Sequence, residues 1–575
     1  MDAIISLAMI VRNEEAYIAR CLESVRHLVN EIIIVDTGST DNTLAVARRY
    51  TSKIYSFPWQ NDFGKARNFA LDKCTGNWIL SLDADETVDA SQGTFRALIE
   101  NHPESKAFLL PLYYQSNKTV QDDERCFVLR FFRNLPEHRF VGKVHEQIPF
   151  KKLDEAVLSP TPKLRHHQVS RKERNRRRHR NLMLLETSLR QEPDNLIYQY
   201  YSALEWQAFG RYIKSLAMLK NVYTGLSDTQ ATFRSHAARQ MLICLRTLGR
   251  NREAATLCEE VSARYPTYTD LYFEGGLVSE QMGKFEIACH WFERALASGL
   301  PPDIFIHTAG TNGFLSYYHL GYCQERLGNW NTAISAYQQA LSENPAYIAP
   351  LYHLFHALSR KLPITKVLDH FQAAGCLQQP QQNETLANLF FVAGYAEIAV
   401  KCACLHQTHS PPAALFRIYA GQPEQARSYY KNLSSEKCLP SVAEIIACIL
   451  CGDLTEAKHL ALDLWKKSDT RNAAWTLLSL IALYKNEHKY ICPEQTREPE
   501  VITATLGILD KCFRHSLAGQ KQAAALTELA YHCIRLLKER TRTGIFALAM
   551  YFQEKEEAWA KVLKDMTLAS PGMAL

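Results

Sequence analysis

The stretch Trp78-Ile-Leu-Ser-Leu82-Asp83-Ala84-Asp85 decides the fold class of this chain. Its first five residues form an apolar run too short for a helix, which is typical of a buried strand. The two aspartates leave the carboxyl end of that strand, where open α/β sheets bind ligands. Alternate residues of an extended chain point the same way, so Asp83 and Asp85 can share one divalent cation and, through it, a nucleotide diphosphate. An ordinary turn or helix cap is the alternative, and the context decides between the two.

The eighty residues before Asp83 alternate between predicted strands and helices. Short apolar runs predict strands, and spacings of three to four predict buried helix faces. Two strands joined by one helix form a parallel crossover unit, so we expect a mostly parallel sheet with Asp36 and Asp83 at the same edge. The expected strands are residues 4–11, 32–35, 53–57 and 78–82. The expected helices are residues 16–28, a helix through Tyr50 capped by Ser39 or Thr40, and residues 64–73.

Four motifs in this order resemble the nucleotide-binding half of the family 2 glycosyltransferases. They are Val11-Arg12-Asn13-Glu14-Glu15, Val35-Asp36-Thr-Gly-Ser39-Thr-Asp41, Ala66-Arg67-Asn68 and Leu82-Asp83-Ala84-Asp85-Glu86. Residues 129–134 and 140–146 are similar to the subgroup that includes lipopolysaccharide-core glucosyltransferases and sublancin-type peptide S-glycosyltransferases. The resemblance covers the first 170 residues. It departs from many members at Ile10-Val11-Arg12, where they have Pro-Thr-Tyr or similar.

The resemblance implies an α/β domain of the GT-A type, with a Rossmann-like, mostly parallel sheet. It also implies inverting transfer of a sugar from a nucleoside diphosphate donor, with a UDP-sugar as the expected donor. The residues expected to bind the donor nucleotide are Val11, Asn13, Glu14, Asp36, Ser39, Arg67, Asp83 and Ala84. A divalent cation, Mg²⁺ or Mn²⁺, is expected on Asp85, Asp83 and His145, where it stabilises the charge of the departing diphosphate.

An inverting displacement requires a base that takes the acceptor's proton on the face opposite the leaving group. Glu146 is our candidate for this catalytic role, with Asp122 and Asp123 next in line. His145 is a candidate for the metal shell or for contact with the diphosphate. Weaker candidates for the task of His145 are His166 and His167. A surface turn with no role is the alternative for His145 and Glu146.

Beyond residue 165 the pattern becomes helical, beginning with the basic cluster Arg171 to Arg180. This cluster is either a solvated helix face or a contact for an anionic acceptor or for the donor's phosphates. Residues 316–347 have the spacing of a tetratricopeptide repeat. A turn glycine followed five residues later by alanine recurs at Gly249 and Ala254, Gly283 and Ala288, Gly328 and Ala333, Gly394 and Ala399, Gly421 and Ala426, and Gly452 and Ala457. The glycine allows a left-handed turn residue, and the small alanine lets two helices approach.

We therefore expect four segments. These are a GT-A nucleotide-sugar glycosyltransferase domain (1–165), a basic helical linker (166–195), tetratricopeptide repeats (196–360), and degenerate helical repeats with C-terminal helices (361–575). A solenoid of helix pairs has a concave face that holds a peptide or protein, so the expected acceptor is a polypeptide, modified on Ser, Thr or Cys. One alternative is a transferase with a glycan acceptor, either cell-surface polysaccharide or lipid-linked saccharide. The others are a non-catalytic scaffold and repeats that form a homodimer.

Composition fits a large bacterial enzyme of the cytoplasm. Charged residues make up 22% and hydrophobic residues 47%, which is ordinary globular usage and argues against disordered and fibrous classes. A net charge of +6 is too small to indicate a nucleic-acid partner. We find no run of eighteen apolar residues and no export signal, so we expect no transmembrane segment. The 16 cysteines are scattered, and we expect buried, reduced thiols.

Overall fold

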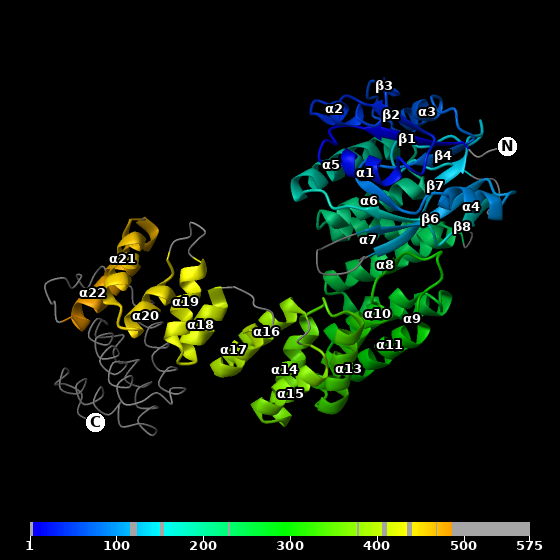
Figure 1. The fold of residues 1–575 in the computed structure, drawn as a ribbon. Helices are drawn as coiled ribbons and strands as arrows, with labels where there is room; N and C mark the ends of the chain where they lie inside the picture. The colour runs from blue at the N-terminus through cyan, green and yellow to red at the C-terminus, as the bar shows by residue number, and fades with distance from the viewer. Residues whose placement is uncertain are drawn as a thin grey trace. The chain divides into compact units, whose positions relative to one another are not determined.

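The computed structural model of the chain describes residues 4–114, 124–149, 155–227, 230–376, 379–404, 411–433, 440–466 and 468–485. The chain divides into two compact units, residues 1–360 and 361–575. The first unit holds a sheet and the first helical repeats, and the second holds further helix pairs (Figure 1). The helices predicted beyond residue 485, and the pair Asp122 and Asp123, lie outside the described residues.

The parallel half of the sheet consists of β1 (Ile5–Val11), β2 (Glu31–Asp36), β3 (Ile54–Ser56) and β4 (Trp78–Ser81). Their spatial order is β3-β2-β1-β4, with parallel pairing throughout. Val11 pairs with Asp36 and Ala8 pairs with Ser81, so the chain leaves β1, β2 and β4 at the same edge. The prediction that Asp36 and Asp83 leave one edge of a mostly parallel sheet is confirmed.

The other half of the sheet is mixed. Its strands are β5 (Glu86–Asp89), β6 (Ala107–Tyr114), β7 (Glu124–Arg133), β8 (Ala156–Leu158) and β9 (Lys163–His166). The order continues from β4 through β7 and β6 to β9 and β5, and β8 pairs with β6. The two halves are joined by β7, which pairs with β4 of the parallel half and with β6 of the mixed half and is antiparallel to both.

Helices cover both faces of the sheet. On one face, α1 (Ile18–Val25) buries Ile18, Leu22 and Val25 against β1, as their spacing predicts. The same apolar cluster includes residues of α4 (Thr94–Asn101). On the opposite face, Ala70 and Leu71 of α3 (Phe63–Leu71) pack with the even-numbered side of β1. Each face of the sheet is therefore covered by its own apolar cluster.

The predicted helix after β2 is shorter than expected, and its predicted cap is wrong. The helix α2 spans only Thr43–Ala47 and begins after Asn42. Ser39 and Thr40 lie in the preceding loop, where they bond to Asn13 instead of capping a helix. These hydrogen bonds with Asn13, in the loop after β1, take the place of the predicted helix cap.

After the sheet, α5 (Arg171–Gln191) leads into a series of antiparallel helices. In the first unit they are α6 (Leu196–Ala208), α7 (Tyr212–Gly225), α8 (Ala231–Thr247), α9 (Asn251–Arg264), α10 (Thr269–Gln281), α11 (Phe285–Ser298), α12 (Phe314–Arg326), α13 (Trp330–Glu343) and α14 (Ala349–Lys361). In the second unit they are α15 (Ile364–Ala373), α16 (Pro380–Val392), α17 (Ala396–Cys404), α18 (Pro411–Tyr419), α19 (Pro423–Leu433), α20 (Val442–Leu450), α21 (Leu454–Trp465), the short η3 (Ser468–Thr470) and α22 (Arg471–Tyr484).

The glycine and alanine pattern of the repeats is confirmed. All six predicted turn glycines have positive φ, between 71° and 93°. All six alanines that follow them are fully buried. At the crossing of α12 and α13, a Cβ on Gly321 would lie 2.7 Å from the ring of Tyr337, so only glycine lets these helices pack so closely. The described helices after α5 therefore form tetratricopeptide-like helical repeats in both units.

The first repeats are tied to the sheet. The connection between α11 and α12 contributes β10 (His307–Thr308), which pairs antiparallel with β7. Behind it, the buried carboxylate of Asp270 accepts from the backbone amide of Thr308 at 2.8 Å and lies 2.7 Å from Nδ1 of His307. Arg239 Nη1 lies 3.3 Å from the same carboxylate. A buried carboxylate needs such partners, so this cluster stabilises the junction.

Two further expectations concern the chain as a whole. In the part that the structure describes, no helix is long and apolar enough to cross a membrane. The cysteines in these segments are free, and most of them are buried.

Candidate active site

Two loops at the carboxyl edge of the sheet are hydrogen-bonded to each other. The Val11 carbonyl accepts from both the amide and the hydroxyl of Thr37, at 2.9 and 3.1 Å. The Asn13 amide donates to Ser39 Oγ at 3.0 Å, and Asn13 Oδ1 accepts from the Thr40 amide at 2.7 Å. Asn13 has a φ of 57°, a left-handed conformation that asparagine tolerates better than most residues. These bonds give the edge a fixed shape before any ligand binds.

Asp36 organises its own loop. Its carboxylate oxygens accept from the backbone amides of Gly38 and Ser39, at 3.1 to 3.2 Å, and its residue is only 7% exposed. A carboxylate oxygen has more than one lone pair, so these bonds leave acceptor capacity for a ribose or base. Asp36 therefore stays a candidate for nucleotide binding, and it also shapes the turn.

Asp83 lies between two arginines. Arg67 Nη2 donates to Asp83 Oδ1 at 2.6 Å, and Arg130 Nη2 donates to Asp83 Oδ2 at 2.9 Å. Burial alone would raise the pKa of Asp83, but the charges of Arg67 and Arg130 outweigh it and hold this pKa well below its usual range. Arg130 also donates at 2.6 Å to Glu86, which is fully buried. Both carboxylate oxygens of Asp83 are thus engaged by guanidinium groups.

Asp85 is buried, with 3% exposure, and meets a residue from outside the sheet. Arg177 Nη1 of α5 lies 2.6 Å from Asp85 Oδ2, and Arg177 Nη2 lies 2.8 Å from both carboxylate oxygens of Glu14. His166 Nε2 lies 3.5 Å from Asp85 Oδ2. Burial raises the pKa of Glu14 to about 7; the charge of Arg177 acts against this shift, and the charge of Asp85 adds to it.

Glu146 is joined to Asp83 through Arg67. Arg67 Nε donates to Glu146 Oε1 while Arg67 Nη2 holds Asp83, and Arg67 itself is 8% exposed. The loop that carries Glu146 lies close to α3, because a Cβ on Gly64 would come within 2.6 Å of the Gly142 carbonyl. Arg67, a residue predicted to bind the donor nucleotide, is paired here with two carboxylates.

His145 faces the helical repeats. Its ring stacks on the ring of Tyr201 in α6, with centroids 3.7 Å apart and an angle of 2° between the planes. Its φ is 51°, and its Nε2 is buried without a hydrogen-bond partner among the described residues. Burial lowers the pKa of His145 to about 4. The imidazole beside Asp85 belongs instead to His166, which the sequence made a weaker candidate than His145. Ala84, between the two aspartates, is buried.

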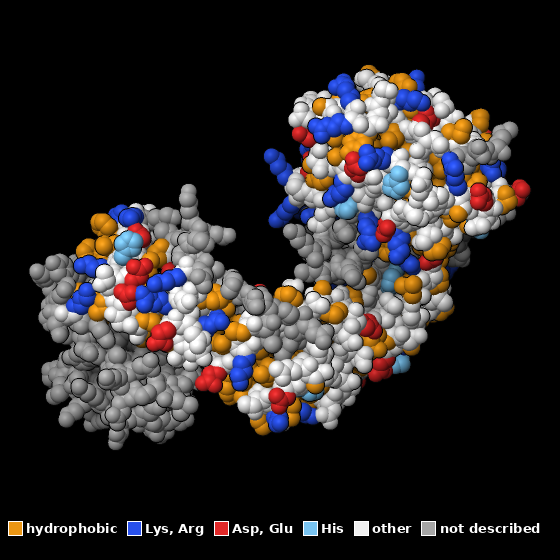
Figure 2. Space-filling view, in the orientation of Figure 1, with side chains coloured by type: hydrophobic (Ala, Val, Ile, Leu, Met, Phe, Trp, Pro, Cys, Tyr) orange, Lys and Arg blue, Asp and Glu red, His pale blue; other side chains and the backbone are white. Residues whose placement is uncertain are grey.

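Arg177 was not among the site residues predicted from the sequence. The basic cluster to which it belongs divides in two: exposed side chains on one side of α5, and Arg177, Arg178 and Arg180 half-buried on the other. Figure 2 shows Lys and Arg side chains projecting where Figure 1 places α5. Arg177 lies four residues after Glu173 and seven before the buried Leu184, which is the spacing of one helix face. That spacing was the available signal.

Acidic side chains outnumber basic ones at the carboxyl edge of the sheet. Seven carboxyl groups and three guanidinium groups lie at this edge or on the part of α5 that meets it. The carboxyl groups are those of Glu14, Asp36, Asp83, Asp85, Glu86, Glu146 and Glu173, and the guanidinium groups are those of Arg67, Arg130 and Arg177. Among the described residues no group of three or more His, Cys, Asp or Glu forms a complete metal site. Mg²⁺ sites usually hold the ion by one or two carboxylates together with substrate phosphates, and the carboxylate of Asp85 is of the type that this pattern needs.

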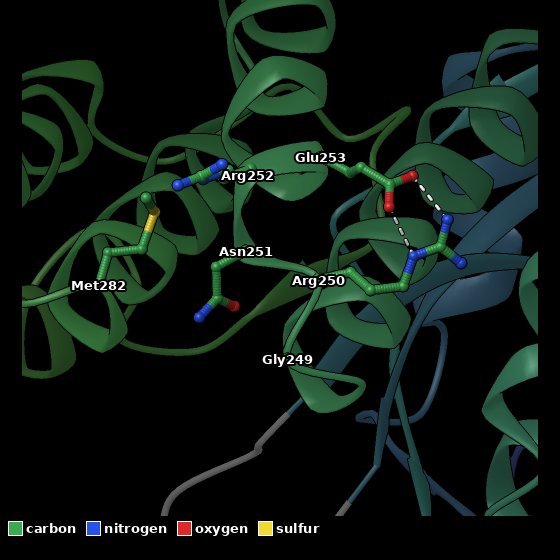
Figure 3. A pocket seen from close by; sticks show the side chains of 6 residues that line it. All are labelled: Gly249, Arg250, Asn251, Arg252, Glu253 and Met282. Atoms are coloured by element: carbon green, nitrogen blue, oxygen red, sulfur yellow. Dashed lines mark hydrogen bonds and ion pairs between the residues drawn. The ribbon is translucent and has the colours of Figure 1, made fainter.

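A separate hollow lies at the turn between α8 and α9, far from this chemistry in the sequence. Its lining residues are Gly249, Arg250, Asn251, Arg252, Glu253 and Met282 (Figure 3). Arg250 and Glu253 pair at 2.6 Å, and both side chains are about half exposed. Such an exposed ion pair contributes little to stability. We assign no function to the hollow, which is lined mainly by the turn between two repeat helices.

Comparisons with known proteins match the sheet domain and the helical repeats to two different families. Residues 6–153 match the family described as Glycosyl transferase family 2, and residues 314–347 match the family described as Tetratricopeptide repeat. A TPR repeat-containing protein of Synechococcus elongatus is 29% identical over 352 residues, which cover 59% of this chain and 66% of that protein. The prophage-derived glycosyltransferase SunS of Bacillus subtilis is 27% identical over 304 residues, which cover 48% of this chain and 67% of SunS.

Other relatives cover less. An uncharacterized glycosyltransferase of Rickettsia felis is 44% identical over 82 residues, which cover 14% of this chain and 29% of the relative. The chain thus spans less than a third of that relative's length and about two thirds of the lengths of the other two. A solved structure, MamA from Desulfovibrio magneticus, is 20% identical and covers 31% of this chain and 92% of its own, with a TM-score of 0.26. That structural likeness is too weak to bear on function.

Proposed function

Because residues 6–153 form a family 2 glycosyltransferase domain that precedes a tetratricopeptide solenoid, we propose that this chain is an inverting glycosyltransferase that moves a sugar from a UDP-sugar to a polypeptide. The observation that carries the proposal is the acidic group at the carboxyl edge of β1, β2 and β4. There Asp83 and Asp85 of the loop after β4 lie beside Glu14 of the loop after β1, next to guanidinium groups that can face a diphosphate.

The donor's nucleoside fits the edge of β1 and β2. Asp36, Asn13 and Ser39 shape a rigid loop pair there, and carboxylates accept hydrogen bonds from ribose hydroxyls and a uracil ring. Asp83, held between Arg67 and Arg130, presents a carboxylate of fixed orientation to the ribose. Preorganised groups of this kind lose little entropy when the donor binds.

Asp85 and His166 are the proposed holders of a Mg²⁺ or Mn²⁺ ion. When bound, such an ion neutralises charge that develops on the departing diphosphate. The protein's own cations, Arg130 and Arg177, lie around the same aspartates and add to the positive potential. Because Asp85 is buried, water screens its charge little, and its attraction for a cation is correspondingly strong.

Glu146 is the proposed base. Its side chain is ion-paired with Arg67, which fixes the carboxylate on the same side of the site as Asp83. A base in this reaction accepts the proton of the acceptor hydroxyl or thiol as the new bond to the anomeric carbon forms.

The proximity of the repeats to this loop supports a polypeptide acceptor. His145, next to Glu146, packs on Tyr201 of α6, and Val144 packs with Leu184 and Leu185 of α5. A peptide held by the repeats would therefore reach the base side of the site first. Holding an acceptor near the reacting atoms raises its effective concentration.

The test is the fate of labelled sugar. The full chain, Mn²⁺ and a bacterial extract are incubated with UDP-sugars that carry radiolabel, with the Asp85→Asn variant as the control. Label that becomes soluble after protease digestion, and that is absent with the variant, supports the proposal. Label that enters organic solvent or protease-resistant polysaccharide would instead assign a lipid-linked or surface saccharide as the acceptor. No transfer with any nucleotide sugar would favour a scaffold.

A further inference from the structure

We propose that Arg177 is a built-in competitor for the divalent cation at Asp85, and that its guanidinium passes to the donor's diphosphate when the cation enters. This inference rests on the proposed function, because it adds a substrate-binding residue to the same site. It concerns a residue of α5, outside the matched family domain at residues 6–153.

Arg177 connects three separate parts of the chain. Its Nη2 spans both oxygens of Glu14 in the loop after β1, its Nη1 meets Asp85 after β4, and its Nε meets Glu173 one turn earlier on α5 at 3.0 Å. Contacts between a guanidinium fork and carboxylates are among the strongest hydrogen bonds in proteins. The side chain is 22% exposed, so solvent screens these contacts only in part.

The same oxygen cannot serve both cations well. Asp85 Oδ2 is bound by Arg177 at 2.6 Å, and a cation bound to Asp85 would lie within a few ångströms of the guanidinium. Like charges at that separation repel strongly in a buried site. The cation therefore has to weaken or displace the contact between Arg177 and Asp85 in order to bind.

A displaced Arg177 has a natural second partner. Donor binding brings a diphosphate to the cation, and a planar guanidinium binds phosphate oxygens in the same two-pronged way as it binds carboxylates. We expect α5 to stay in place during this exchange, because Leu184 and Leu185 pack against Val144. Only the long side chain has to turn. The cation and the donor should then bind together more tightly than either binds alone.

The first experiment uses Mn²⁺ alone, with free Mn²⁺ followed by electron paramagnetic resonance during titration of the full chain. We expect Arg177→Gln to bind Mn²⁺ at least tenfold more tightly than the wild type. The matched control is Arg176→Gln, since Arg176 is 61% exposed, also pairs with Glu173, and should leave the Mn²⁺ affinity unchanged. Equal or weaker Mn²⁺ binding by Arg177→Gln would overturn the competition. If that variant does not fold, Arg177→Lys decides in the same way, because lysine lacks the fork that spans Glu14 and Asp85.

The second experiment measures UDP binding calorimetrically at saturating Mn²⁺. We expect Arg177→Gln to bind UDP about tenfold more weakly, while Arg176→Gln binds it like the wild type. Unchanged UDP affinity in Arg177→Gln would overturn the transfer to the diphosphate. If the wild type binds neither UDP nor other nucleoside diphosphates, the proposed function fails along with this step. The Mn²⁺ titration then still decides the competition between Arg177 and the cation.

Discussion

Tyr201 lies flat on His145, with ring centroids 3.7 Å apart, and so joins the first repeat helix to the loop that carries the candidate base. Burial beneath α6 lowers the pKa of His145 to about 4, so its ring is neutral at physiological pH. Burial also raises the pKa of Tyr201 to about 12, against the hydrogen bond with Gln147. The repeats therefore help to form the site as well as follow it in the sequence.

Truncating this contact should weaken catalysis and stability together. We expect Tyr201→Ala to lose roughly 3 kcal/mol of unfolding free energy, as for other large aromatic truncations, and to slow transfer because the Glu146 loop loses its support. Tyr201→Phe keeps the stacked ring and loses only the hydroxyl that bonds Gln147, so it serves as the control and should lose about 1 kcal/mol with little change in transfer. Thermal melting and nucleotide release measure the two effects. An alanine variant as active and stable as the phenylalanine variant would show that the contact is incidental.

The base assignment predicts a change in turnover without a change in donor binding. Glu146→Gln keeps the shape of the side chain but cannot accept the proton, so turnover should fall on the order of a hundredfold. Glu155→Gln is a suitable control, because Glu155 pairs with Lys106 on the other half of the sheet. Turnover that is unaffected in Glu146→Gln would move the role to another carboxylate, with Asp122 and Asp123 next to be replaced.

The two compact units predict where the chain can be cut. A fragment of residues 1–360 keeps α5, α6 and β10 and should bind UDP and Mn²⁺ like the whole chain. A fragment that ends at Arg180 loses the leucines that cover Val144 and loses Tyr201, so we expect it to aggregate. Size-exclusion chromatography and UDP binding distinguish the two fragments. A soluble, UDP-binding fragment of residues 1–180 would contradict a structural role of the first repeats in the catalytic domain.

His236 predicts how stability depends on pH. It is buried in α8, 2.6 Å from the Tyr200 hydroxyl, and burial together with the charge of Arg239 lowers its pKa from 6.5 to about 3. The unfolded chain therefore binds one more proton between these values, and stability falls as the pH falls from 6.5 toward 3. The slope from this group is at most about 1.4 kcal/mol per pH unit.

The variant His236→Asn removes that group and isolates its share of the slope. The wild type should be the more stable protein at pH 7, and the difference should shrink as the solution is acidified. Denaturant unfolding at several pH values measures this. If the difference in unfolding free energy between the wild type and the variant does not change with pH, His236 binds its proton equally well in the folded and in the unfolded chain, which would contradict this prediction.

The elements that could be predicted are those with local signals. The run from Trp78 to Leu82 is apolar and short, so β4 and the place of Asp83 follow from it. Six of the repeat turns carry a glycine that is followed five residues later by an alanine, so the repeats can be recognised in the sequence. In both cases neighbouring residues alone determine the structure.

The relationships that could not be predicted join distant segments. Arg177 and Asp85 are 92 residues apart, and no local pattern records their contact. His166 rather than His145 lies beside Asp85 because β9 pairs with β5, which places His166 opposite Glu86. The two-residue strand β10 depends on a connection between repeats that only the folded chain brings to β7. Tertiary pairing decided each of these, and the sequence carries little trace of it.

The most direct test of the central claim is donor cleavage by the full chain with Asp85 replaced. The measurement is release of nucleoside diphosphate from UDP-sugars in Mn²⁺, with and without excess chelator, for the wild type and for Asp85→Asn. We predict that the wild type releases UDP only with the metal, and that the variant releases none although its melting temperature is close to that of the wild type. Metal-independent release, or full release by Asp85→Asn, would contradict the proposed site.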